Sequence, residues 1–143
     1  MSRHARTLLA IGTLLALPAL AACSSDDPAS DTGGTTVDVA MRDWSIEVDP
    51  ASVPAGEITF QASNDGPTTH EFEIFSGDIP SDPLPVSDGV ADTGDLVLVD
   101  EVEDVVAGTT ADLTVDLDAG QYLVICNLAD HYEEGMSTTL TVE

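Results

Sequence analysis

Residues 119–142, with the sequence AGQYLVICNLADHYEEGMSTTLTV, carry the most informative pattern in the chain. An unbroken apolar run at residues 122–126 predicts a central β-strand, because a strand buried on both faces has no polar side. Residues 136–142 alternate between apolar or small and polar side chains, which predicts a second strand with one face toward solvent. The polar loop between these strands has three chemically distinctive residues in the spacing Cys-x4-His-x4-Met: Cys126, His131 and Met136.

The rest of the chain repeats this period of two and shows no sustained helical period. In HEFEIF, His70, Phe72 and Ile74 share one face and two glutamates occupy the other. Short strands separated by turns rich in Pro, Gly, Asn and Asp predict an all-β sandwich. Residues 76–95, rich in Pro, Gly and Asp, are predicted to be an excursion over the surface. Further runs with the alternating pattern are residues 37–42, 58–62 and 111–118.

Downstream of Cys23 the sequence has two histidines, one further cysteine and two methionines. Four of these five residues form one set, namely His70 and the three residues of the C-terminal loop. Two imidazoles, a thiolate and a weakly bound thioether make up the ligand set of a type 1 (blue) copper site. Each residue alone has a plainer explanation in the core or in a solvated loop, but their joint placement predicts copper ligation. The fifth residue, Met41, is predicted to belong to the core, and Tyr122 is predicted to be structural.

The segment around this loop resembles the C-terminal signature of cupredoxins, the family of plastocyanin, azurin, rusticyanin and sulfocyanin. In that signature a Gly-x-Tyr pair, here Gly120 and Tyr122, leads into the strand that ends at the copper cysteine. A Gly-Met pair, here Gly135 and Met136, opens the last strand. The resemblance covers residues 37–143, and its Cys-to-His spacing is more similar to rusticyanin or azurin than to plastocyanin. A Pro-Gly turn and an Asn-Gly corner upstream of the first histidine also fit, at Pro54, Gly56, Asn64 and Gly66.

The resemblance implies a Greek-key β-sandwich that binds one copper ion, cycling between Cu(II) and Cu(I), through His70, Cys126, His131 and Met136. It implies that His70 is buried, and that Cys126 is the strongly bonded thiolate that gives the blue colour. His131 would be the ligand nearest solvent and the electron exit, while Met136 would tune the reduction potential. One position departs from the family: plastocyanin and azurin have an asparagine beside the first histidine, whereas this chain has Glu71.

The first 22 residues have the composition of an export signal. Arg3 and Arg6 precede an apolar run at residues 7–22, which is shorter than the roughly 20 residues of a permanent membrane span. The final quartet, LAAC, resembles the lipobox of bacterial lipoproteins and predicts a lipidated Cys23; an ordinary signal peptide cut nearby is the alternative. Residues 23–36 contain no large apolar side chain and are predicted to be a flexible tether, followed by the cupredoxin domain at residues 37–143.

The charge of the chain is strongly asymmetric. All 27 acidic residues lie after Cys23, where Arg42 is the sole Lys or Arg, so this part has a formal charge of −26 with neutral histidines. A nucleic-acid partner is excluded, because phosphates require Lys and Arg for neutralisation. The acidity suits either a cationic partner or salty surroundings. Asp130, Glu133 and Glu134 are by default a solvated loop and also candidates for docking.

The predicted function is outer-sphere electron transfer by a membrane-tethered copper protein. We expect a monomer anchored through Cys23 to the outer face of the cytoplasmic membrane, periplasmic or at the cell surface. Its partner is expected to be a redox protein such as a basic cytochrome or a membrane oxidase. A copper-delivery or storage lipoprotein is the alternative, although such sites usually use several Met or His and no Cys. An enzyme is not expected, because multicopper oxidases and copper nitrite reductases need histidines beyond His70 and His131.

Overall fold

The alternating runs form β-strands in the computed structural model, which describes residues 34–143. Such runs favour strands because one face of each can be buried while the other meets water. The strands are β1 (Thr35–Arg42), β2 (Ser45–Asp49), β3 (Ser52–Val53), β4 (Gly56–Asn64), β5 (His70–Ser76), β6 (Val86–Ser87), β7 (Val90–Ala91), β8 (Val97–Val105), β9 (Thr110–Leu117), β10 (Gly120–Ile125) and β11 (Ser137–Val142).

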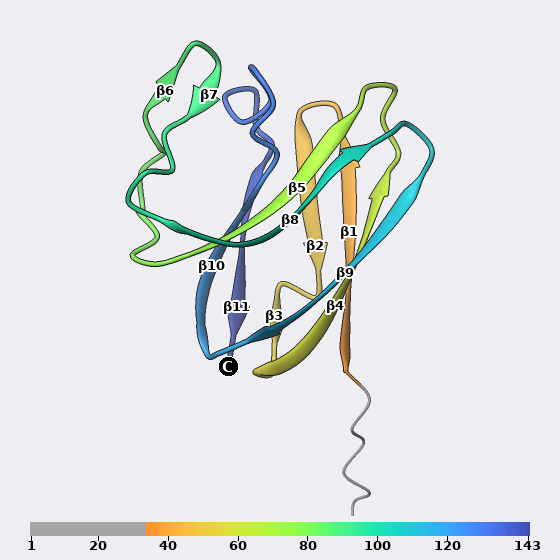
Figure 1. Cartoon of the computed structure of the whole chain (residues 1–143), viewed down its shortest axis with the longest axis vertical. Helices are drawn as coiled ribbons and strands as arrows, with labels where there is room; N and C mark the ends of the chain where they lie inside the picture. The colour runs from red at the N-terminus through yellow and green to blue at the C-terminus, as the bar shows by residue number, and fades with distance from the viewer. Residues whose placement is uncertain (1–33) are drawn as a thin grey trace, which may run out of the picture. The chain divides into compact units, whose positions relative to one another are not determined.

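Two main sheets pack against each other (Figure 1). One has the strand order β2-β1-β4-β9 and the other β3-β11-β10-β5-β8, while β6 and β7 form a small separate pair. The β1–β4 and β3–β11 pairs are parallel and the remaining pairs are antiparallel. The predicted all-β sandwich is therefore confirmed, with β10 inside its sheet as its unbroken apolar sequence predicts.

The main core lies between the two sheets. Phe60 of β4 and Phe72 of β5 meet there with ring centroids 5.4 Å apart and planes tilted by 47°. Both rings are fully buried, and replacing a buried ring of this kind by alanine costs about 3–5 kcal/mol. Met41 is also fully buried, which confirms that it belongs to the core. The hydroxyl of Tyr122 donates to the carbonyl of Asp118 at 2.9 Å and ties β10 to the turn before it.

Residues 77–96 are more than the predicted excursion over the surface. They carry the β6–β7 hairpin and pack on the second sheet, where they build a separate small core. Ile79, Leu84 and Leu96 pack there against a buried cluster that includes Tyr132 of the C-terminal loop. The apolar residues of this segment are separated by Pro, Gly and Asp without a regular period, so the sequence pattern did not indicate their burial. The buried members of this core are Phe75, Ala91, Leu123, Ile125 and Tyr132.

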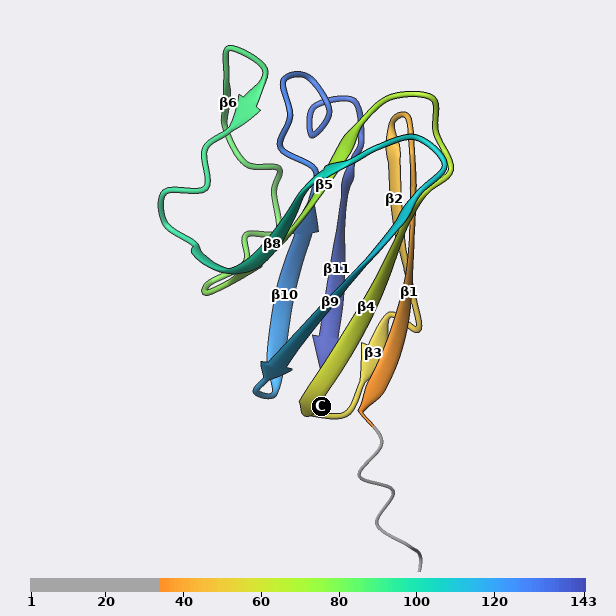
Figure 2. The same cartoon turned by 45° about the vertical axis from the view of Figure 1, so that its right-hand side comes forward.

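Several loops gather at one end of the sandwich. The β1–β2 turn, the β6–β7 hairpin and the loop between β10 and β11 all lie at the upper end in Figures 1 and 2. The β4–β5 connection reaches the same end, so β5 begins there with His70. This arrangement brings the residue that starts β5 next to the loop that follows β10.

The predicted export signal at residues 1–22, the lipidated Cys23 and most of the tether lie outside the described residues. Within the described part, β1 begins at Thr35, two residues before the predicted domain boundary. Residues 34–143 include no long apolar helix of the kind that spans a membrane.

Candidate metal centre

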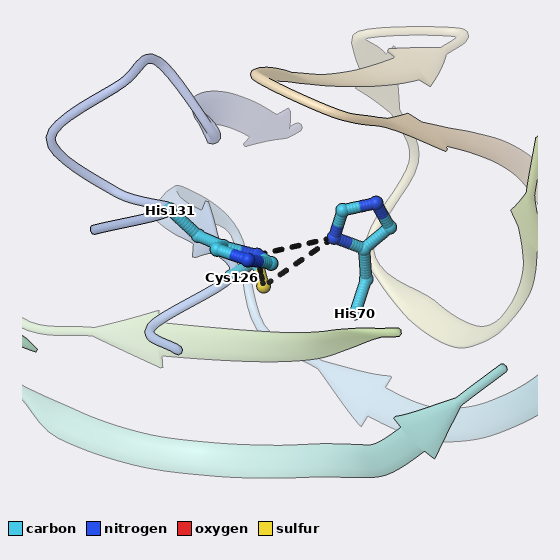
Figure 3. A group of neighbouring side chains, drawn as sticks. All are labelled: His70, Cys126 and His131. Carbon is cyan, nitrogen blue, oxygen red and sulfur yellow. Dashed lines mark hydrogen bonds between the residues drawn. The ribbon is translucent and has the colours of Figure 1, made fainter. Parts of the chain in front are cut away.

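Three side chains that are far apart in sequence converge at the loop-bearing end of the sandwich (Figure 3). The Nδ1 atoms of His70 and His131 are 3.2 Å apart. The Sγ atom of Cys126 lies 3.2 Å from Nδ1 of His131 and 4.0 Å from Nδ1 of His70. Two ring nitrogens and one sulfur therefore form a compact triangle. Among residues 34–143 this is the one group of His, Cys and acidic side chains with metal-binding geometry.

Each of these side chains is held by the end of a strand or by a short turn. His70 is the first residue of β5, and Cys126 directly follows β10. The backbone N–H of Cys126 donates to the carbonyl of Met136 at 3.1 Å, which closes the loop at its base. Within the loop, the N–H of Met136 donates to the carbonyl of His131 at 3.0 Å. The loop therefore has a defined shape set by its own backbone hydrogen bonds.

The triangle fits a first-row transition metal. An ion about 2.0–2.3 Å from nitrogen and sulfur ligands in one plane would space those atoms about 3.5–4.0 Å apart. Two of the observed separations, 3.2 Å each, are slightly shorter than that spacing, and the third, 4.0 Å, lies at its upper limit. A thiolate with two imidazoles is the in-plane donor set of a type 1 copper site. The residues present therefore fit copper.

Burial controls the protonation of two of these groups. Burial lowers the pKa of His70, as does the nearby His131, while the carboxylate of Asp43 acts in the opposite direction. A neutral imidazole is the form that binds a metal, so this shift favours ligation. Burial raises the pKa of the Cys126 thiol. Hydrogen bonds from the N–H groups of Glu71 and Leu128 act in the opposite direction and lower it. Metal binding at Cys126 therefore releases a proton.

The fourth predicted ligand, Met136, is fully buried in the main core directly before β11. Its assignment as the axial ligand stays a prediction. The predicted docking residues Asp130, Glu133 and Glu134 are exposed on the loop that carries His131. These acids therefore lie exposed on the loop that follows Cys126, and their role in docking stays a prediction.

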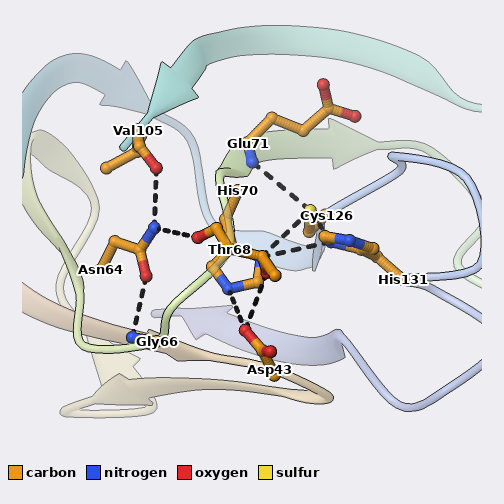
Figure 4. A network of polar contacts seen from close by, with 9 residues as sticks. All are labelled: Asp43, Asn64, Gly66, Thr68, His70, Glu71, Val105, Cys126 and His131. Carbon is orange, nitrogen blue, oxygen red and sulfur yellow. Dashed lines mark hydrogen bonds and ion pairs between the residues drawn. The ribbon is translucent and has the colours of Figure 1, made fainter. Parts of the chain in front are cut away.

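Glu71, which stands where plastocyanin and azurin have an asparagine, fastens the loop that follows β10 (Figure 4). Its backbone N–H donates to Sγ of Cys126 at 3.3 Å. Its carboxylate accepts the backbone N–H of Asn127 at 3.0 Å. One residue of β5 therefore contacts both Cys126 and Asn127. At this position a glutamate, in place of an asparagine, holds the loop.

The 77–96 segment braces the loop from the outside. The side-chain amide of Asn127 donates to the carbonyl of Ala91 and accepts its N–H, at 3.3 and 2.8 Å. The N–H of Asp130 donates to the carbonyl of Gly89 at 2.8 Å. The hydroxyl of Tyr132 accepts the N–H of Leu84 at 2.9 Å. The residues on both sides of His131 are thus bonded to this segment, which holds the histidine in place.

The turn between β1 and β2 contributes two residues that sequence reasoning did not find. Oδ1 of Asp43 lies 3.4 Å from Nε2 of His70. The ring of Trp44 stands edge-on to His131, with centroids 5.6 Å apart and an interplanar angle of 84°. Trp44 adopts a left-handed conformation, with φ of 71°, and is 49% exposed. Exposure and backbone conformation are properties of the folded chain, so the sequence offered no signal for these two residues.

Glu73 lies on the outer face of β5, opposite Glu101 of β8. Burial raises its pKa to about 7, and the negative charges of Glu71 and Glu101 add to that effect. Its Oε2 atom is buried and has no hydrogen-bond partner. Glu73 is therefore a strand residue whose ionised form the folded protein disfavours.

Glu73 is expected to contribute a fall in the free energy of unfolding as the pH rises from about 4.5 to about 7, its ordinary and folded pKa values. In that range the unfolded chain ionises Glu73 while the folded chain keeps its proton, so unfolding releases a proton and becomes easier. Glu73→Gln should flatten this part of the profile, measured by urea denaturation at several pH values. Glu57→Gln, at an exposed position of β4, is the control. An unchanged slope in Glu73→Gln would contradict the assignment.

Comparisons with known proteins agree with this picture. The chain matches the family model of the cupredoxin-like domain over residues 13–142. Auracyanin A, a "blue" copper protein from Chloroflexus aurantiacus, is similar in structure with a TM-score of 0.56 and 19% identity, covering 78% of this chain and 100% of its own. Rusticyanin from Thiobacillus ferrooxidans gives a TM-score of 0.54 and 21% identity, covering 77% and 79%. These similarities show a shared fold. A search of curated protein sequences finds no match.

Proposed function

Because the chain belongs to the cupredoxin-like family, we propose that it is a one-electron carrier that holds one type 1 copper ion through His70, Cys126, His131 and Met136. The observation that supports this most directly is the triangle of two imidazole nitrogens and one thiol sulfur, 3.2–4.0 Å apart. The proposal assigns the chain electron transfer and no catalysis of its own.

When bound, the copper supplies the chemistry by alternating between Cu(II) and Cu(I). The role of the protein is to hold the ligand atoms in fixed positions. His70 is fixed in a strand, and the loop carrying Cys126 and His131 is bonded to β5 and to the 77–96 segment. A rigid ligand set moves little when the charge changes, which keeps the reorganisation energy low. His131 is partly exposed beside Trp44, so these two rings form the proposed exit for the electron.

Titration of the purified, processed protein with Cu(II), followed by optical and EPR spectroscopy, tests this proposal. We expect one copper per chain and an intense visible absorption from the copper–thiolate bond. Reversible one-electron reduction should follow in cyclic voltammetry. Copper bound without that absorption would contradict a type 1 site. Several weakly bound ions per chain would favour delivery or storage instead.

We also propose that the chain is exported through residues 1–22 and anchored by a lipid on Cys23. Cys23→Ala is expected to release the protein from the membrane fraction or to block its processing, because it removes the site of the proposed lipid anchor. Cell fractionation and mass spectrometry of the mature N-terminus measure both results. Cys23→Ala protein that is correctly cleaved and still bound to the membrane would show that another anchor exists.

We propose a basic redox protein, such as a cationic cytochrome, as the partner. Glu133 and Glu134 are exposed on the loop of His131, and the chain after Cys23 has a formal charge of −26. Opposite charges accelerate encounter, and salt screens them: the Debye length is about 10 Å at 0.1 M and about 3 Å at 1 M. Electron-transfer rates with a cationic cytochrome should therefore fall steeply with ionic strength.

The double variant Glu133→Gln/Glu134→Gln should flatten that salt dependence in stopped-flow measurements. The matched control is Glu57→Gln/Asp116→Asn, an exposed cross-strand pair where β4 begins and β9 ends, at the opposite end of the sandwich (Figure 1). It removes the same charge far from His131. Equal slopes for the two double variants would mean that general acidity, and not this loop, governs the encounter.

A further inference from the structure

The β1–β2 turn touches both histidines of the metal centre through consecutive residues, Asp43 and Trp44. Figure 4 shows the contact of Asp43 with the ring of His70. The side chain of His70 is completely buried, and that of Asp43 is 24% exposed. A carboxylate therefore stands behind a buried histidine, on the side away from the other two donor atoms.

The geometry defines what each nitrogen of His70 can do. Its Nδ1 atom faces Cys126 and His131, so Nδ1 is the nitrogen available to a metal. The proton of the neutral ring must then sit on Nε2. Nε2 is buried and makes no hydrogen bond of ordinary geometry, and the acceptor that faces it is Oδ1 of Asp43 at 3.4 Å. Oδ1 is itself oriented by a hydrogen bond of 2.8 Å from the hydroxyl of Thr68.

We propose that Asp43 is a positioning residue that fixes the Nε2–H tautomer of His70 and stabilises Cu(II) relative to Cu(I). This inference rests on the proposed function, because it concerns the copper site. A carboxylate that accepts the distal N–H of a metal-bound imidazole orients the ring and makes it a stronger donor. A negative charge in a partly desolvated place also favours the more highly charged oxidation state. Both effects lower the reduction potential.

The alternative is that Asp43 serves only the turn, through its hydrogen bond to Thr68. Asp43→Asn separates the two roles, because asparagine keeps a carbonyl that can accept from Thr68 and from Nε2 but carries no charge. We expect Asp43→Asn to keep the visible absorption and to shift the relative affinity toward Cu(I) about tenfold. That ratio corresponds to a rise in the reduction potential of about 59 mV for one electron.

Glu134→Gln is the matched control, since it removes one charge from an exposed position of the ligand loop. We expect a smaller shift in this variant, because solvent screens an exposed charge. Equal shifts in the two variants would show that only overall charge matters and would overturn the special role of Asp43. No shift in Asp43→Asn would overturn it as well.

A second measurement does not depend on copper. In the metal-free protein at neutral pH, ¹⁵N NMR of the histidine rings should show His70 as the Nε2–H tautomer. In Asp43→Ala the population should move toward the Nδ1–H form, while Thr68→Ala, which removes only the hydroxyl partner, should leave the tautomer in place. An unchanged tautomer in Asp43→Ala would refute the contact. If the contact holds and copper gives no type 1 spectrum, the proposed function fails and the positioning of His70 does not.

Discussion

Replacing Cys126 by serine is expected to abolish the visible absorption of the copper-loaded protein completely. That absorption requires a thiolate bonded to copper, and Cys126 is the free cysteine of the described residues. A serine hydroxyl in the same buried position stays protonated and is a poor ligand for a soft ion. The copper affinity should fall by more than the roughly 10–100-fold typical of residues that only support a ligand. Optical titration and competition with a chelator measure both effects.

A control must separate lost ligation from lost folding, because a buried hydroxyl without a partner costs about 1–3 kcal/mol. Ala62→Ser introduces the same group at a fully buried core position of β4, away from the ligands. It should lower the free energy of unfolding and keep the colour. Circular dichroism should show that both variants retain the sheet. A coloured Cys126→Ser variant would remove the type 1 assignment.

Met136 is expected to set the reduction potential more than the copper affinity, because an axial thioether bonds weakly. Met136→Leu removes the axial donor and leaves an apolar side chain, which disfavours Cu(II) and should raise the potential. Met136→Gln offers an oxygen donor, which favours Cu(II) and should lower it. Each shift should reach several tens of millivolts, where about 59 mV equals a tenfold change in relative affinity. Protein-film voltammetry measures the values directly.

Met41→Leu provides the matched control for Met136→Leu. Both methionines are fully buried in the main core, and exchange of Met for Leu conserves volume at a cost below about 1.5 kcal/mol. Met41 lies on β1 outside the ligand loop, so its replacement should leave the potential unchanged. Equal potentials in both variants, or complete loss of copper from Met136→Leu, would show that Met136 does not act as a weak axial ligand.

The sequence predicted those parts of the molecule that repeat or cluster along the chain. Period-two alternation located β1, β4, β5, β9 and β11, and the unbroken apolar run located β10 inside its sheet. The joint spacing of His70, Cys126 and His131 predicted side chains that the structure brings together. Strand periodicity and the Cys-x4-His-x4-Met spacing are local properties that need no knowledge of packing, whereas His70 entered the predicted set through the scarcity of histidine and the resemblance to cupredoxins.

The support around the metal centre could not be predicted, because it arises from contacts between distant segments. Asp43 meets His70 only once the β1–β2 turn is placed over the start of β5. Asn127 meets Ala91 only once the 77–96 segment packs on the outer face of the second sheet. Glu71 was noticed as a departure from the family, but its bond to the N–H of Asn127 depends on the packing of β5 beside β10.

The bracing of the ligand loop has a consequence for the lifetime of the bound ion. To open around His131, the loop must break its hydrogen bonds to Leu84 and Gly89 and withdraw Tyr132 from the small core on the second sheet. Because these contacts share one short loop, they break together, as a single local unfolding event. We therefore expect loss of a bound ion from the folded protein to be limited by the rate of that opening. A site of only moderate affinity would, by this means, still retain its ion through many rounds of oxidation and reduction.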